Sequence, residues 1–102
     1  MDLLQQMKKA KPTVLEVLKT ITKARDNDTL LLVEVWKRQA KNEIVSYGEF
    51  KYQLLTEELS PPETITRTRR KLQEQNKELR GRLYLVRKKQ EQVAKNQLRF
   101  DF

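Results

Sequence analysis

Turn-forming residues are scarce in this sequence, and their scarcity limits the folds that the chain can adopt. Its 102 residues include only two glycines and three prolines. A β-rich domain needs many turns, and Gly and Pro are the residues that most often make them. Apolar residues also recur at helical spacing, as in Val14, Leu15, Val17, Leu18 and Ile21. The sequence therefore predicts an all-α protein.

Periodicity and capping residues divide the chain into predicted helices. The first runs from Thr13, directly after Pro12, to about residue 23. The second follows the polar turn 26–28 and ends near residue 40; it is apolar almost all round, which predicts the most buried helix of the domain. Two Ser-x-x-Glu capping boxes, which begin at Ser46 and Ser60, predict the starts of the third and fourth helices. Proline at the first helical position strengthens the second box.

The end of the chain is predicted to be a further basic helix. Gly81 indicates a break or a kink, residues 82–95 have helical spacing, and residues 96–102 are predicted to be a tail. The run 82–86 also fits a short strand, and the sequence does not decide between the two.

The third and fourth predicted helices are short and joined by a tight turn, which is the plan of a helix-turn-helix. We predict a small helical bundle with a helix-turn-helix core, or a winged-helix-like form of it, and a basic C-terminal helix. The expected organisation is an N-terminal arm or short helix over 1–12, the helix-turn-helix domain over 13–80, and the basic helix and tail over 81–102. The predicted core residues are Leu18, Leu30, Val33, Trp36, Phe50, Ile65 and Leu72.

The positive charge lies in one part of the chain. The formal net charge is +8; residues 1–60 hold 10 Lys and Arg against 9 Asp and Glu, whereas residues 61–102 hold 12 against 5. A charge-balanced part joined to a strongly basic part is typical of a body that carries a contact surface for a polyanion.

Several function classes are disfavoured by composition. The chain has no cysteine and no histidine, so it lacks thiolate metal sites, the commonest general base and every Ser/His or Cys/His nucleophile pair. We predict no enzymatic activity, no metal, no cofactor and no small-molecule substrate. The first residues do not resemble a secretory signal, and the longest apolar run, residues 30–33, is too short to cross a bilayer. A cytoplasmic protein is expected.

The fourth predicted helix carries the candidate contact surface. Ile65 and Leu72 lie on one side of it, and Arg67, Arg70 and Lys71 lie on the far side. Arginine suits such a surface because its planar fork of donors can bind guanine or phosphate in pairs. Lys8, in the charge-balanced part, is expected to contribute little. The predicted nucleic-acid-binding residues are Thr64, Thr66, Arg67, Arg70, Lys71, Glu74, Lys77, Arg80 and Arg82.

Two stretches resemble a group of small uncharacterised phage and prophage proteins. Residues 24–36 (ARDNDTLLLVEVW) are similar to the helix start of that group, and residues 60–74 (SPPETITRTRRKLQE) to its S-P-E-T-I-x-R-x-R-R-K-x-Q helix. This chain has two prolines where that pattern has one. The resemblance implies a viral or prophage origin and a helix-turn-helix-like core. It implies no activity and transfers no catalytic residue.

These observations favour a protein that binds nucleic acid, with duplex DNA expected, as a phage regulator or replication accessory in a bacterial cell. The alternative is a protein-interaction module whose basic helices dock on an acidic host or phage protein. The basic segment 80–89 has three interpretations: it extends the phosphate contact, docks on a second protomer in a homodimer, or lies on an anionic membrane. The membrane is the least favoured because the segment has only a weak apolar face. Single-stranded binding needs exposed aromatic residues, and Tyr84, Phe100 and Phe102 are too scattered to favour it.

Overall fold

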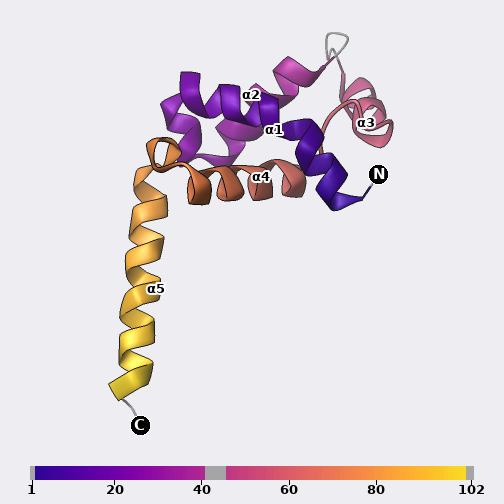
Figure 1. The fold of residues 1–102 in the computed structure, drawn as a ribbon. Coiled ribbons are helices and arrows are strands. Elements are labelled where there is room, and N and C mark those ends of the chain that lie inside the picture. Colours follow the sequence, from indigo (N-terminus) through magenta and orange to yellow (C-terminus); the bar gives the residue numbers. More distant parts are fainter. Residues whose placement is uncertain (1, 41–45, 101–102) are drawn as a thin grey trace.

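The protein is all-α. The structure, a computed structural model, describes residues 2–40 and 46–100, with side chains as far as residue 95, and all regular structure in those ranges is helical (Figure 1). The run 82–86 is therefore helix and not strand. The elements are α1 (Leu3–Thr20), the 3-10 helix η1 (Thr22–Arg25), α2 (Asp28–Gln39), α3 (Tyr47–Leu55), α4 (Pro62–Gln75), the 3-10 helix η2 (Lys77–Leu79) and α5 (Arg82–Phe100).

The first helix begins well before its predicted start at Thr13. Asp2 and Gln5 form a capping box that starts α1 at Leu3, and the helix continues through Pro12. A proline inside a helix removes one backbone hydrogen bond and costs about 3 kcal/mol. Residues on both sides of Pro12, including Ala10 and Val14, are fully buried, and this packing outweighs the local penalty. The predicted start was wrong, and the expected boundary at residue 12 falls inside α1.

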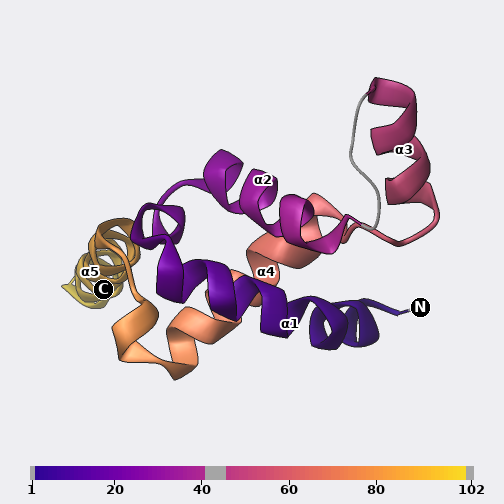
Figure 2. The ribbon, with the colours of Figure 1, turned by 90° about the horizontal axis from the view of Figure 1, so that it is seen from above.

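The core is built by α1, α2 and α4, which pack against one another (Figure 2). Leu18, Ile65 and Leu72 are buried as predicted, but Val33 is 41% exposed. The prediction that the second helix is the most buried was wrong, because α1 contributes four buried residues to the core and α2 contributes two. The buried apolar residues are Ala10, Val14, Val17, Leu18, Ala24, Leu31, Val35, Leu59, Ile65, Leu72, Leu79 and Tyr84, with Leu30 and Trp36 partly buried against them.

Helix α3 lies at the side of this core (Figure 2). It begins where predicted, and the Ser46 hydroxyl accepts a hydrogen bond from the Glu49 backbone N–H at 3.2 Å. The half-buried ring of Phe50 meets Trp36 edge-on, with 4.9 Å between the ring centroids. Helix α4 packs chiefly on α1 and α2. The pairing of α3 with α4 as a helix-turn-helix therefore stays a prediction.

The predicted capping box at Ser60 was wrong. Helix α4 begins at Pro62 after Pro61, and no side chain of the described residues caps it. The Gln39 side chain holds Ser60 instead: it donates to the Ser60 hydroxyl at 2.7 Å and accepts from the Ser60 backbone N–H at 2.8 Å. Ser60 is thus used to connect α2 to the segment before α4. The proline at the first helical position is Pro62, one residue later than the capping box at Ser60 implied.

Helix α5 projects from the body, and the whole molecule measures 56 × 27 × 23 Å (Figure 1). Gly81 lies at the break between η2 and α5, as predicted. The helix continues to Phe100, so the predicted tail at 96–100 is helical, while residues 101–102 lie outside the described residues. Tyr84 is the one buried residue among the side chains described on α5. In the described part of the chain, no helix is both long and apolar enough to cross a membrane.

Candidate nucleic-acid interface

The outward face of α4 exposes the cations that the sequence predicted, but it is nearly charge-balanced. Arg67, Arg70 and Lys71 are all exposed. Glu63 and Glu74 are exposed on the same helix, and the Glu63 carboxylate lies 2.6 Å from the Arg67 guanidinium. Two carboxylates therefore offset most of the charge of the three cations. This face alone is a weak attractor for a polyanion.

The two predicted threonines do not present free hydroxyls to a ligand. Thr64 is 1% exposed, and its hydroxyl is 3.1 Å from the Gln6 side-chain oxygen on α1. The half-buried Thr66 hydroxyl donates to the backbone carbonyls of Pro62 and Glu63, one turn earlier in the helix. Placing Thr64 in the contact surface was wrong, because its side of α4 packs on α1.

Arg80 joins α4 to α5 and is only partly accessible. Its Nε donates to the Gln73 carbonyl at 2.6 Å, and its Nη2 donates to the Glu74 carbonyl at 3.0 Å. These carbonyls end α4 and have no partners within the helix, so the guanidinium completes the helix terminus. The guanidinium carbon also lies 4.8 Å from the centre of the Tyr84 ring. Arg80 is therefore a structural residue, although it was predicted from the sequence to belong to the contact surface.

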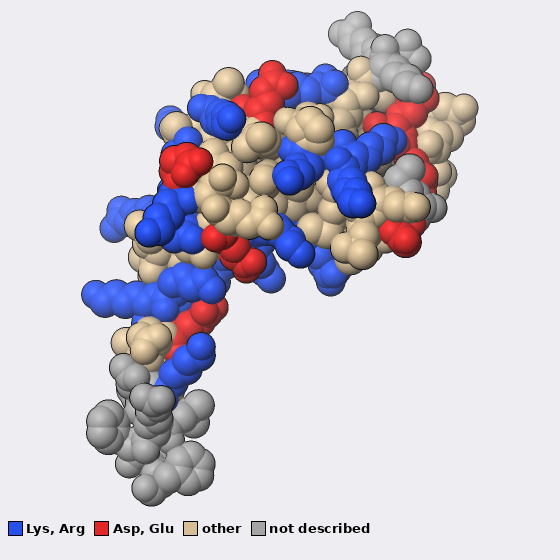
Figure 3. Space-filling view, viewed as in Figure 1, with Lys and Arg blue, Asp and Glu red and all other residues tan. Residues whose placement is uncertain are grey.

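Lys77 and Arg82 are exposed, as a contact role requires. Both follow α4 in the chain, in η2 and at the start of α5. Figure 3 shows that Lys and Arg side chains continue along α5 in this view, beyond the body.

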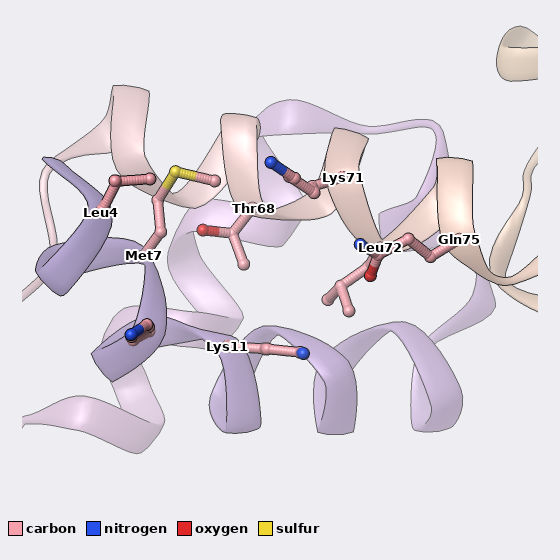
Figure 4. A pocket seen from close by; sticks show the side chains of 8 residues that line it. Leu4, Met7, Lys11, Thr68, Lys71, Leu72 and Gln75 are labelled. Atoms are coloured by element: carbon pink, nitrogen blue, oxygen red, sulfur yellow. The ribbon is translucent and has the colours of Figure 1, made fainter.

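A second group of cations lies in a groove between α1 and α4, and the sequence reasoning missed it. The groove has a volume of about 200 Å³. Figure 4 shows Lys11 of α1 and Lys71 of α4 on its opposite sides, with Leu72 between them. We call this site the lysine groove; it is lined by Leu4, Met7, Lys8, Lys11, Thr68, Lys71, Leu72 and Gln75.

The lysine groove is more one-sided in charge than the outward face of α4. Its lining includes three lysines and no carboxylate. Among the described residues, Lys8, Lys11 and Lys71 have no ion pair. Three ammonium groups from two helices, over an apolar floor, form a local positive potential that an anion would neutralise.

Lys8 is therefore not separate from the basic part of the chain. It shares a groove with Lys71, although 62 positions of sequence lie between them. The spacing of Lys8 and Lys11 places both on one helix face, and this signal was available in the sequence. This signal was not used, because residues 1–12 were expected to form an N-terminal arm or short helix outside the main domain.

No protein-family model, curated protein or solved structure matches the chain. The resemblance to phage and prophage proteins therefore stays a prediction. Within the described residues, no group of three or more Asp and Glu side chains is placed to hold a metal ion.

Proposed function

We propose that the protein binds nucleic acid, with duplex DNA as the expected form, through phosphate contacts from the lysine groove. The observation that carries this proposal is the meeting of Lys8, Lys11 and Lys71 in a groove without a lining carboxylate. Phosphate contacts supply much of the affinity of nucleic-acid-binding proteins, and they need positive charge rather than a particular side-chain fork. The lysines meet this requirement better than the charge-balanced outward face of α4.

Arg70 is the residue that we propose for contact with a base. It is exposed on the face of α4 next to the lysine groove, and no ion pair engages it in the described part of the chain. Arg67, in contrast, would first have to leave Glu63. An α-helix with its side chains is about 10–12 Å wide, which suits a major groove about 12 Å wide.

The role that we propose for this binding is that of a phage or prophage regulator or replication accessory in the cytoplasm of a bacterial cell. The resemblance of residues 24–36 and 60–74 to phage proteins supports this role. We assign the protein no catalytic step. Incubation with plasmid and magnesium should give no cutting, and nuclease activity that a single Asp or Glu substitution abolishes would contradict this assignment.

The experiment compares two triple variants that lose the same charge. Lys8→Ala, Lys11→Ala, Lys71→Ala removes the lysine groove, and Lys19→Ala, Lys23→Ala, Lys51→Ala removes three exposed lysines elsewhere. Affinity for a mixed-sequence duplex is measured by fluorescence anisotropy across a salt series. The slope of log affinity against log salt should become shallower by about 0.9 for each groove lysine that contacts a phosphate.

The control triple variant should keep most of the parent slope, because its lysines lie outside the groove. Circular dichroism confirms that both variants are folded. If the groove variant is folded and binds duplex with the affinity and salt slope of the parent, the lysine groove is not the contact surface. Arg70→Ala should in addition cost about 1–3 kcal/mol for the preferred duplex if this residue reads a base edge.

A further inference from the structure

Over residues 82–95 of helix α5, one face packs against nothing in the described part of the chain. The contact of α5 with the body is made near its start, where Tyr84 is 6% exposed. Beyond that turn the helix extends alone (Figure 1). Leu83, Val86 and Val93 are 59%, 44% and 49% exposed, a large exposure for apolar side chains on a helix of this length.

These apolar residues form a stripe along α5, and only its first residue, Leu83, lies beside the polar pocket between α5 and the body. Leu83, Val86, Gln90 and Val93 are spaced by three and four residues, as the a and d positions of two heptads are. We call these four residues the α5 stripe. The side chains of Val86, Gln90 and Val93 also line one shallow depression, so they share a face in the structure. Tyr84, which contacts the body, lies on the opposite side of the helix.

The charged residues of α5 that flank the α5 stripe are all positive, and the carboxylates of Asp26 and Asp28 lie only at its Leu83 end. Arg82 and Lys89 flank it on one side, and Arg87 flanks it on the other. Glu91, the one carboxylate in residues 82–95, lies away from the stripe, and its carboxylate is 3.5 Å from the Lys88 amine. An apolar stripe with cationic edges complements an apolar stripe with acidic edges.

The same charges disfavour pairing with a second copy of this helix. In a parallel pair, the flanking positions would set Arg82 of one copy against Arg87 of the other. In an antiparallel pair, residues of the same flank would face each other, again with like charges. A partner helix with Glu at these positions would replace each repulsion with an attraction.

We infer that α5 is a docking site for an acidic amphipathic helix of another protein. The apolar residues of the partner would cover the α5 stripe, and its carboxylates would face Arg82, Arg87 and Lys89. Gln90, a polar residue within the stripe, would favour one register of the pair, as polar residues at such positions do. This site is separate from the lysine groove, so the inference does not depend on the proposed nucleic-acid binding.

The test uses the full chain and two designed helical peptides. Both peptides have Leu and Val at the a and d positions; one has Glu at the flanking positions, and the other has Lys. Binding is followed by fluorescence anisotropy of the labelled peptide. We expect the Glu peptide to bind and the Lys peptide to bind at least tenfold more weakly.

Three variants locate the binding on α5. Val86→Glu, Val93→Glu should weaken binding of the Glu peptide at least tenfold, whereas Leu85→Glu, at an exposed apolar residue off the stripe, should weaken it far less. Arg87→Glu, Lys89→Glu should reverse the preference and favour the Lys peptide. These side chains are exposed on α5, so the body should stay folded; circular dichroism and the fluorescence of Trp36 check this.

Other results would overturn the inference. Equal binding of the two peptides, or of neither, excludes an acidic helix as the partner. A dimer in sedimentation that Val86→Glu, Val93→Glu dissociates would assign the stripe to a second copy of the chain. Binding to phosphatidylglycerol vesicles without binding to the Glu peptide would assign it to an anionic membrane.

Discussion

Asp26 caps the N-terminus of α5, and Gly81 is the residue that allows its carboxylate to approach. The two carboxylate oxygens of Asp26 accept hydrogen bonds from the backbone N–H groups of Arg82 and Leu83, at 3.0 and 2.9 Å. A Cβ atom added at Gly81 would lie less than 3.0 Å from this carboxylate. A negative charge at a helix N-terminus satisfies free N–H groups and interacts favourably with the helix dipole. The turn before α2 therefore fixes the start of a helix that lies far along the chain.

The two glycines should respond in opposite ways to substitution by alanine. Gly81→Ala should displace Asp26 and lower the free energy of unfolding by about 1–2 kcal/mol, the usual effect of losing a cap. Gly48→Ala is the matched control: it lies in α3, and its added Cβ would meet only the Ser46 hydroxyl at 3.8 Å. This change should be neutral or stabilise the protein by up to roughly 1 kcal/mol. Urea unfolding measures both, and equal midpoints would contradict the capping role of Asp26.

Gln39 should contribute more to the free energy of unfolding than Ser60, although of these two residues only Ser60 was expected to stabilise a helix. Gln39→Ala removes two hydrogen bonds and leaves the N–H of the buried Ser60 without its partner, which costs about 1–3 kcal/mol. Ser60→Ala removes one of the two bonds and should cost less. Thermal unfolding of both variants gives the order, with Gln92→Ala on the exposed part of α5 as a neutral control. A larger loss for Ser60→Ala would restore the cap interpretation.

Arg69 and Arg70 are adjacent on α4, but only Arg69 should contribute to the stability of the fold. Arg69 has a side chain that is 15% exposed; it pairs with Asp28 and donates to the Ala24 carbonyl at 3.3 Å. Arg69→Ala should therefore lower the free energy of unfolding by roughly 1–2 kcal/mol. The exposed Arg70 should change it by less than about 0.5 kcal/mol when replaced by Ala. Equal melting temperatures for the two variants would show that the Arg69 contacts contribute nothing.

The pair of Glu34 and Arg38 should make a pH-dependent contribution to stability. The Arg38 guanidinium donates to the Glu34 carboxylate at 2.9 Å, and this hydrogen bond, with the nearby charge of Lys37, lowers the pKa of Glu34 below its usual 4.5. A carboxyl with a lowered pKa stabilises the fold above the unfolded-state pKa and loses this effect as the pH falls through the folded-state value. Glu34→Gln should thus be less stable than the parent at neutral pH, and the difference should shrink below pH 4.5.

Repeating the Glu34→Gln comparison in an Arg38→Met variant checks the cause of this pH dependence. Replacing Arg38 with Met removes the main donor to Glu34. In that background, Glu34→Gln should have a smaller effect at neutral pH, as measured by urea unfolding at several pH values. An unchanged effect would show that Arg38 is not the cause.

Features that depend on neighbouring residues were predictable from the sequence. The all-α class, the start of α2 at the polar turn 26–28, the start of α3 at Ser46 and the break at Gly81 were all predicted. The all-α class rests on composition and apolar periodicity, and the other three rest on signals within about one helical turn, such as a side-chain oxygen three residues before a free N–H. These signals hold because little else in the fold competes with them.

Features that depend on distant residues were not predictable. Ser60 has the local pattern of a cap, but Gln39, 21 residues earlier, takes its hydrogen bonds. In the candidate site, helix geometry was enough to predict that Arg70 and Lys71 are exposed. That Lys8 lines the same groove as Lys71 depends on how α1 packs on α4. No pattern of neighbouring residues in the sequence predicts how α1 packs on α4.

The attachment of α5 through its first turn has a consequence for how the molecule unfolds. A single helix of this length is marginally stable in water without tertiary contacts, so α5 should melt gradually and at lower temperature than the body. Trp36, the single tryptophan, lies on α2, where its ring meets Phe50 of α3, and its fluorescence reports on the body alone. Far-ultraviolet dichroism reports on every helix at once. The two signals should therefore give different unfolding curves, and a two-state analysis of the tryptophan signal would describe only the body.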